Sequence, residues 1–141
     1  MSVDSKENIE RFVQFQGGIR STLKMLEEGT ISDINIRDSS YNDGTALMYQ
    51  AYHGTVESME SLLAHKPPAL PNLQDRRGWT ALHYAVDSRY DPAKVRLLLD
   101  NGADKTIKTN AGNTALDMAM GRGCPPEYIK VLESYIPKLR G

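Results

Sequence analysis

One short pattern recurs three times along the chain. The triplet Thr-Ala-Leu begins at Thr45, at Thr80 and at Thr114, so that successive copies stand 35 and 34 residues apart. A fixed internal period of this length is typical of arrays in which every unit is one supersecondary element that buries its apolar face against its neighbours. The repeat therefore predicts a stack of similar units that share one continuous core.

Within each unit the apolar residues have helical spacing. Each triplet opens a segment of about nine residues that we predict to be a helix, with the threonine hydroxyl as its N-cap. After a short loop that contains Gly or Pro, a second apolar stripe follows with spacings of three and four. The members of these stripes are Met59, Leu62 and Leu63, then Val95, Leu97, Leu98 and Leu99, then Ile129, Val131 and Leu132. The sequence thus predicts helix, loop, helix and polar turn in each unit.

A weaker unit precedes these three. Two apolar stripes, at 9–13 and 23–26, are separated by Gly17-Gly18, and Asp4 with Glu7 predicts a capping box ahead of the first stripe. Because an end unit of a stack has one face in water, its sequence is expected to be atypical. We therefore divide the chain into four units, at roughly 5–40, 41–74, 75–108 and 109–141.

The segment Gly78-Trp79-Thr80-Ala81-Leu82-His83 and the later segment Leu98-Leu99-Asp100-Asn101-Gly102-Ala103-Asp104, together with the period, resemble the ankyrin repeat. The chain departs from the family in having Ala after Thr where Pro is usual, and in having Met48 and Asp117 where this segment has His83. The resemblance implies an all-α fold, an ankyrin-repeat solenoid of about four stacked helix-loop-helix units joined by β-hairpin-like turns, with atypical terminal capping units. We expect residues 1–141 to form this one domain. Asn35 resembles hairpin asparagines that are hydroxylated in some members of the family.

The residue types of catalytic and metal sites are sparse. One cysteine, Cys124, and three histidines are too few soft ligands for an ordinary structural zinc site. Cys124 lies in a predicted loop with no histidine partner, and His83 in the Thr-Ala-Leu-His turn is expected to make structural hydrogen bonds. No glycine-rich phosphate loop is present. We therefore predict no catalytic residue, no metal and no cofactor, and a chain that is not an enzyme.

In proteins that this sequence resembles, the hairpin tips and the exposed side of the first helices form a concave surface that binds other proteins. Carried over residue by residue, the candidate partner-binding residues are Tyr41, Tyr52, His53, Arg76, Arg77, Trp79, Asp87, Arg89, Asn110, Asn113 and Arg122. Trp79 is the strongest single indication of a partner-binding surface, because Trp, Tyr and Arg are enriched at interface hot spots. Two interpretations stay open: Trp79 anchors a partner together with Arg76 and Arg77, or its ring lies flat against a neighbouring hairpin and adds stability only.

The leading hypothesis is a protein–protein interaction module, acting as an adaptor, scaffold or regulatory subunit whose partner is another protein. The alternative starts from the charge distribution: residues 1–65 carry a net charge of −5 and residues 66–141 carry +4. In this alternative, the chain binds nucleic acid or acidic targets in a salt-sensitive manner through Arg76, Arg77, Arg89, Lys105 and Lys108. The net charge of −1 over the whole chain argues against a dedicated polyanion binder and places nucleic acid second.

The ends of the chain bear on its location. The first eight residues are polar and have no apolar core of a signal peptide, and the Met1-Ser2 start suggests an intact N-terminus. No stretch approaches the ~18 apolar residues of a membrane span. We expect a cytoplasmic or nuclear chain, monomeric on its own, that does not bind membranes.

Overall fold

The computed structural model describes residues 24, 27–29, 33–37, 42–89 and 91–136. Within these ranges lie six helices and no strand: α3 (Ala46–His53), α4 (Val56–Ala64), α5 (Ala81–Ser88), α6 (Pro92–Asp100), α7 (Ala115–Gly121) and α8 (Pro126–Ser134). They form three helix pairs, and the first helix of each pair begins at the alanine of a Thr-Ala-Leu triplet. This arrangement confirms the predicted all-α repeat. Most of the weaker upstream unit, with its Gly17-Gly18 break, lies outside the described residues.

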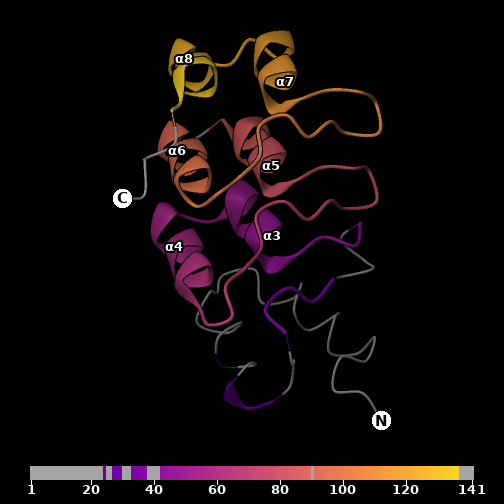
Figure 1. The fold of residues 1–141 in the computed structure, drawn as a ribbon, viewed down its shortest axis with the longest axis vertical. Coiled ribbons are helices and arrows are strands. Elements are labelled where there is room, and N and C mark those ends of the chain that lie inside the picture. The colour runs from indigo at the N-terminus through magenta and orange to yellow at the C-terminus, as the bar shows by residue number, and fades with distance from the viewer. Residues whose placement is uncertain (1–23, 25–26, 30–32, 38–41, 90, 137–141) are drawn as a thin grey trace.

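The helices are arranged in two columns. Helices α3, α5 and α7 stack on one another in the first column, and α4, α6 and α8 stack beside them in the second (Figure 1). The loops that join one pair to the next extend outward from the first column (Figure 1). Leu62, Leu98 and Leu132 of the second column are 0%, 0% and 1% exposed, so the predicted apolar stripes do face a shared core. No helix in the described part of the chain is both long and apolar enough to cross a membrane.

Side-chain caps fix where the helices of the first column begin. The hydroxyls of Thr45 and Thr114 accept hydrogen bonds from backbone N–H groups three residues further on, at 3.4 and 3.1 Å. At the start of α5 the backbone N–H of Thr80 donates to Nδ1 of His83 at 3.0 Å. The N–H groups in the first turn of a helix have no intrahelical acceptor. These hydrogen bonds provide side-chain acceptors for some of the N–H groups at the helix starts. The predicted N-caps at Thr45 and Thr114 are thus confirmed.

Tight turns close the outward loops. The N–H of Asp75 donates to the carbonyl of Trp79, and the N–H of Thr109 donates to the carbonyl of Asn113, both at 2.9 Å. Consecutive hairpins are also joined to each other, because the N–H of Asn110 donates to the carbonyl of Arg77 at 3.0 Å. The predicted β-hairpin-like connections are therefore present, and each is held against the next.

The turns that follow the second-column helices are joined by asparagine side chains. Asn72 donates from Nδ2 to the carbonyl of Gly102 at 3.0 Å and accepts from the N–H of Asp104 at 2.7 Å. Asn35 makes the same pair of bonds one unit earlier, to the carbonyl of Pro68 at 3.3 Å and from the N–H two residues further on at 2.8 Å. Successive units are therefore bonded at this edge as well as at the hairpins.

Gly78 is required at the hairpin for two reasons. Its φ is +79°, and a Cβ atom there would lie 2.7 Å from the backbone nitrogen of Asn110 in the next hairpin. Gly112 has a similar φ, +86°, but a Cβ atom there would meet nothing beyond its chain neighbours within 4 Å. We expect Gly78→Ala to lower the free energy of unfolding by about 1–2 kcal/mol, and Gly112→Ala by less, since only Gly78→Ala adds a contact that forces the hairpins apart. Urea unfolding of both variants tests this, and equal losses would show that the contact with Asn110 adds nothing.

Candidate functional site

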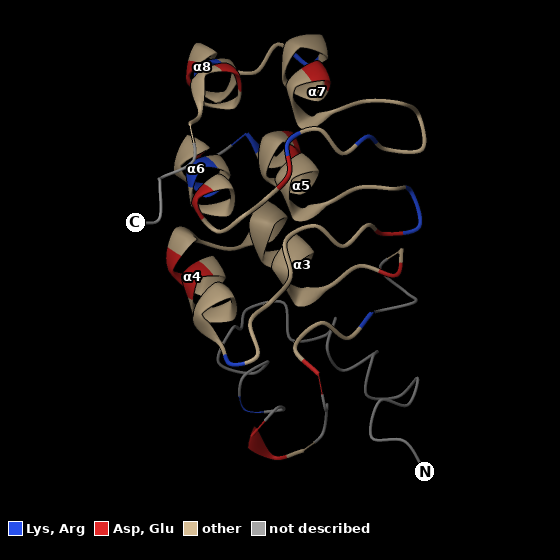
Figure 2. Ribbon diagram, viewed as in Figure 1, with Lys and Arg blue, Asp and Glu red and all other residues tan. Residues whose placement is uncertain are grey.

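Six of the predicted partner-binding residues lie together where the ends of α3, α5 and α7 meet the hairpin that precedes α5. With Tyr84 they form what we call the arginine–aromatic face: Tyr52, Arg77, Trp79, Tyr84, Asp87, Arg89 and Arg122. Basic residues mark the tip of the hairpin, whereas α4 in the second column carries acidic residues (Figure 2). Tyr41 lies outside the described residues. The centre of this face is Trp79, a half-buried ring that packs against the core.

Arg77 is fixed over Trp79 by a short network. Its guanidinium carbon lies 4.1 Å from the centroid of the Trp79 ring, and its Nη2 donates to the hydroxyl of Tyr84 at 2.9 Å. The Tyr84 hydroxyl in turn donates to the carboxylate of Asp75, which is buried. The other oxygen of Asp75 accepts the backbone N–H groups of Arg77 and Trp79, both at 2.9 Å. A stacked and bonded guanidinium is held in one geometry while remaining exposed.

The Tyr84 hydroxyl stays protonated at neutral pH. Burial, and then the hydrogen bond to Asp75, raise the pKa of Tyr84 to about 12. The phenol therefore remains a hydrogen-bond donor to the Asp75 carboxylate throughout the physiological range. This keeps the Arg77–Tyr84–Asp75 chain in a single arrangement of donors and acceptors.

Arg122 reaches the same tryptophan from the third helix pair. It follows α7 directly, and its guanidinium carbon lies 5.7 Å from the Trp79 centroid. The guanidinium is paired with Asp87 of α5, and the backbone carbonyl of Arg122 accepts from Nη1 of Arg89 at 3.4 Å. The second and third pairs are therefore linked through side chains on the arginine–aromatic face.

Tyr52 extends the face to the first pair. Its ring stands edge-on to Tyr84, with centroids 6.4 Å apart, and its other neighbour is His53, with centroids 4.7 Å apart. Behind it, the buried Lys94 donates from Nζ to the carbonyl of Ala51 at 3.2 Å, at the end of α3. Burial first, and then the positive charge of Lys94, lower the pKa of His53 below its ordinary value. His53 is thus neutral at physiological pH, and the charges on this part of the surface come from the arginines and Asp87.

The other predicted residues take part in the hairpins. Arg76 pairs with Asp43 at 3.2 Å, in a largely exposed ion pair of the kind that contributes little to stability. Asn110 donates from Nδ2 to the carbonyl of Arg76 at 2.9 Å. The carbonyl of Asn113 lies 3.1 Å from Nε2 of His83. These three residues lie at exposed tips. The bonds of Arg76 and Asn110 join consecutive hairpins, and the bond of Asn113 joins its hairpin to α5.

Two residues of the network, Asp75 and Tyr84, were not predicted. A signal for Asp75 was present, because an aspartate two residues before the tip of a turn commonly accepts backbone N–H groups there. Tyr84 stands three residues before Asp87 on α5, so that the two share a helix face. Nothing in the sequence indicates that Asp75 and Tyr84 bond to each other.

The side chains that could have supported chemistry have structural partners. Cys124 is buried, with Sγ 3.7 Å from the carbonyl of Val86, and burial raises the pKa of its thiol. His83 is also buried; it accepts at Nδ1 from Thr80 and therefore donates from Nε2 to Asn113. The described residues contain no group of three or more His, Cys, Asp or Glu placed to hold a metal ion.

The buried His83 makes stability depend on pH. Burial lowers the pKa of His83 below its ordinary value of 6.5, so the unfolded chain binds the proton more readily than the folded chain. The contribution is complete above pH 6.5 and is lost as the pH falls towards the folded pKa, by at most about 1.4 kcal/mol per pH unit. We expect His83→Gln, which keeps an acceptor for the Thr80 N–H but cannot be protonated, to flatten the decline between pH 7 and pH 5. Urea unfolding across this range measures both slopes, and parallel slopes would contradict the role of His83.

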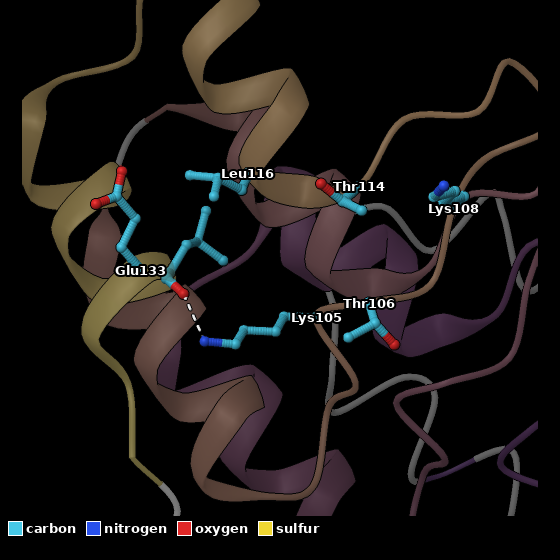
Figure 3. Close-up of a pocket in the computed structure, with 7 residues that line it drawn as sticks. Lys105, Thr106, Lys108, Thr114, Leu116 and Glu133 are labelled. Carbon is cyan, nitrogen blue, oxygen red and sulfur yellow. Dashed lines mark hydrogen bonds between the residues drawn. The ribbon is translucent and has the colours of Figure 1, made fainter.

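A pocket of about 440 Å³ lies beside α7 and α8, and its lining includes Lys105 and Lys108, two of the basic residues predicted for the alternative function. Leu116 and Leu132 supply apolar walls, and Lys105 extends across it (Figure 3). The Nζ of Lys105 donates to the carbonyl of Leu132 at 2.8 Å, where α8 nears its end (Figure 3). Lys105 thus caps a helix whose last carbonyls lack intrahelical partners.

The comparisons with known proteins agree with this architecture. A profile of the family described as "Ankyrin repeats (3 copies)" matches residues 12–109 and again residues 71–136. The chain is 37% identical over 70 residues to the human NAD-capped RNA hydrolase NUDT12, covering 50% of the chain and 15% of that protein. It is 30% identical over 121 residues to a Caenorhabditis elegans homologue of transient receptor potential cation channel subfamily A member 1, covering 86% of the chain and 10% of that protein. Ankyrin repeat protein 14 of vaccinia virus is 39% identical over 69 residues, or 48% of the chain and 28% of the viral protein. The chain therefore spans only a small part of the length of each relative.

Proposed function

This chain belongs to the ankyrin-repeat family, and from that premise we propose that it is an adaptor, scaffold or regulatory subunit that binds another protein through its arginine–aromatic face. Ankyrin repeats generally mediate protein–protein interactions. The proposal concerns which part of this stack makes the contact and which residues carry most of its binding energy. We place Trp79 and Arg77 at its centre, with Tyr52 and Arg122 on either side.

One observation carries the proposal: a row of aromatic and arginine side chains runs across all three described helix pairs. Tyr52 contributes from α3, Tyr84 from α5, and Arg122 from the end of α7, with Trp79 between the last two. These are the residue types in which binding energy concentrates at interfaces. The Asp75 network orders Arg77 in advance, so binding loses less side-chain entropy than it would with a freely rotating arginine.

We propose further that the chain has no catalytic activity of its own. The ankyrin-repeat fold is typically a non-enzymatic binding module. The match to the RNA hydrolase covers 15% of that enzyme. The buried Cys124 and His83 are each engaged with backbone carbonyls of the stack.

Trp79→Ala tests the binding surface. We expect proteins captured from a cell extract by the native chain to include at least one that Trp79→Ala fails to capture, and its purified form to bind the variant more than about tenfold more weakly. Capture followed by mass spectrometry identifies the partner, and titration calorimetry measures the affinities.

The matched control is Tyr135→Ala. Tyr135 is also a half-buried ring beside an arginine, with the guanidinium carbon of Arg96 5.6 Å from its centroid, but it follows α8 in the second column. We expect this variant to retain the partner. Unchanged affinity of Trp79→Ala together with a lower melting temperature would mean that the ring only stabilises the stack.

A further inference from the structure

We propose that the arginine–aromatic face recognises an acidic peptide segment, in which one carboxylate binds Arg77 and a neighbouring apolar side chain packs on Trp79. This inference rests on the proposed function, because it names the chemistry of the partner that the same face would bind. Two features carry it: which arginines already have carboxylate partners, and how the guanidinium groups are held.

The carboxylates on this face leave positive charge uncompensated. Asp87 is paired with Arg122, and Asp43 is paired with Arg76. Asp75 is buried and directs its oxygens to two backbone N–H groups and the Tyr84 hydroxyl. Of the carboxylates that the structure describes, none lies within 4.0 Å of the side-chain nitrogens of the two remaining arginines, Arg77 and Arg89.

The fixed geometry of the Arg77 guanidinium favours the binding of a carboxylate. One of its five N–H groups is directed to Tyr84, and its plane stacks on Trp79, so its free N–H groups have a defined direction. A planar guanidinium binds a carboxylate through two parallel hydrogen bonds, and a guanidinium already fixed in place makes those bonds at a lower entropic cost. The exposed part of the Trp79 ring and the Tyr52 edge beside Tyr84 give apolar area next to it.

The spacing suits an extended segment. The guanidinium carbons of Arg77 and Arg122 both lie within 5.7 Å of the centroid of one tryptophan ring. Side chains at positions i and i+2 of an extended peptide point to the same side and stand ~7 Å apart. A carboxylate at one of these positions can therefore bind Arg77, and one at the other can approach Arg122, which it would share with Asp87, while the residue flanking them can contact Trp79.

A peptide fits these groups better than a nucleic acid does. A nucleic acid needs a track of unpaired cations to replace the counterions of successive phosphates. Of the basic residues proposed for that alternative, Arg76 is paired with Asp43 and Lys105 donates to the Leu132 carbonyl. Arg77, Arg89 and Lys108 are left without a carboxylate within 4.0 Å among the described residues, and three separate cations suit one or two carboxylates better than a run of phosphates.

Selection from a random 12-residue peptide library displayed on phage, against the full chain, tests the inference. We expect the recovered peptides to be enriched in Asp and Glu, often two residues apart and next to an apolar residue. A fluorescein-labelled consensus peptide should bind about tenfold more weakly to Arg77→Gln, and Arg77→Lys should recover part of the loss. The control Arg96→Gln removes an exposed arginine that stacks on Tyr135 elsewhere, and it should leave the affinity within about twofold of native.

The outcomes separate this inference from the proposed function. Peptides that lose binding in Trp79→Ala but carry no excess of acidic residues, or are unaffected by Arg77→Gln, would overturn the acidic segment and leave the face as a binding surface. Peptides that bind Trp79→Ala and the native chain equally would overturn both. Tighter binding of a 12-nucleotide single-stranded DNA than of the consensus peptide, lost in Arg77→Gln, would assign the face to nucleic acid instead. Melting temperatures of each variant confirm that it is folded at the assay temperature.

Discussion

Leu98→Ala is expected to reduce the free energy of unfolding by about 2–5 kcal/mol. Leu98 is 0% exposed in the last turn of α6, a helix that contacts both α4 and α8. The substitution removes buried apolar atoms and leaves a cavity. The helices on either side can fill this cavity only by shifting from their native packing. Chemical denaturation followed by circular dichroism measures the loss.

Leu97→Ala on the same helix is the matched control. Leu97 is half-buried and lies one residue away, so it shares the helix propensity change but not the full burial. We expect a loss of about 1 kcal/mol or less. Equal losses at the two positions would mean that the core of the second column is not tightly packed around Leu98.

Asp75→Ala is expected to cost about 2–4 kcal/mol and also to disorder the arginine–aromatic face. The carboxylate accepts three hydrogen bonds, from the backbone of Arg77 and Trp79 and from the hydroxyl of Tyr84, and these donors would lose their partner together. Trp79 is the single tryptophan of the chain, so its fluorescence reports on the hairpin directly while circular dichroism reports on the helices. We expect the emission spectrum to change even at temperatures where the helices remain folded.

Asp75→Asn separates the hydrogen bonds from the charge. The amide oxygen can still accept the two backbone N–H groups, so we expect a loss of about 1 kcal/mol and a native-like emission spectrum. A loss as large as that of Asp75→Ala would show that the negative charge, through Arg77 and Tyr84, stabilises the hairpin more than the backbone hydrogen bonds do.

The parts of this fold that depend on local signals could be predicted from the sequence. The apolar stripes, the threonine caps and the turns between units each depend on residues within a few positions of one another, and the repeat shows them three times. The residues of the candidate site came from the family resemblance, which placed Tyr52, Asp87 and Arg122 at corresponding helix ends of successive units and Trp79 at a hairpin tip.

What could not be predicted depends on contacts between units. The bond from Tyr84 to Asp75 exists because the hairpin folds back over α5, and the sequence carries no signal for that approach. Lys94 shows the same difficulty, because lysine is seldom fully buried, yet it is 3% exposed here and directs its ammonium group to the end of the preceding unit's first helix. Lys105 belonged to the proposed basic surface, but its ammonium group is bonded to the Leu132 carbonyl.

The asparagine bridges at the turns and the backbone bonds between hairpins have a mechanical consequence. Asn72 joins two units on one margin of the stack, while Asn110 joins the corresponding hairpins on the other. A force applied along the long axis must extend both margins at once, because both are hydrogen-bonded to the next unit. A unit therefore cannot open on one side while the opposite side acts as a hinge. Under tension, the array should therefore lengthen in abrupt steps as whole units detach, with little elastic stretching between the steps.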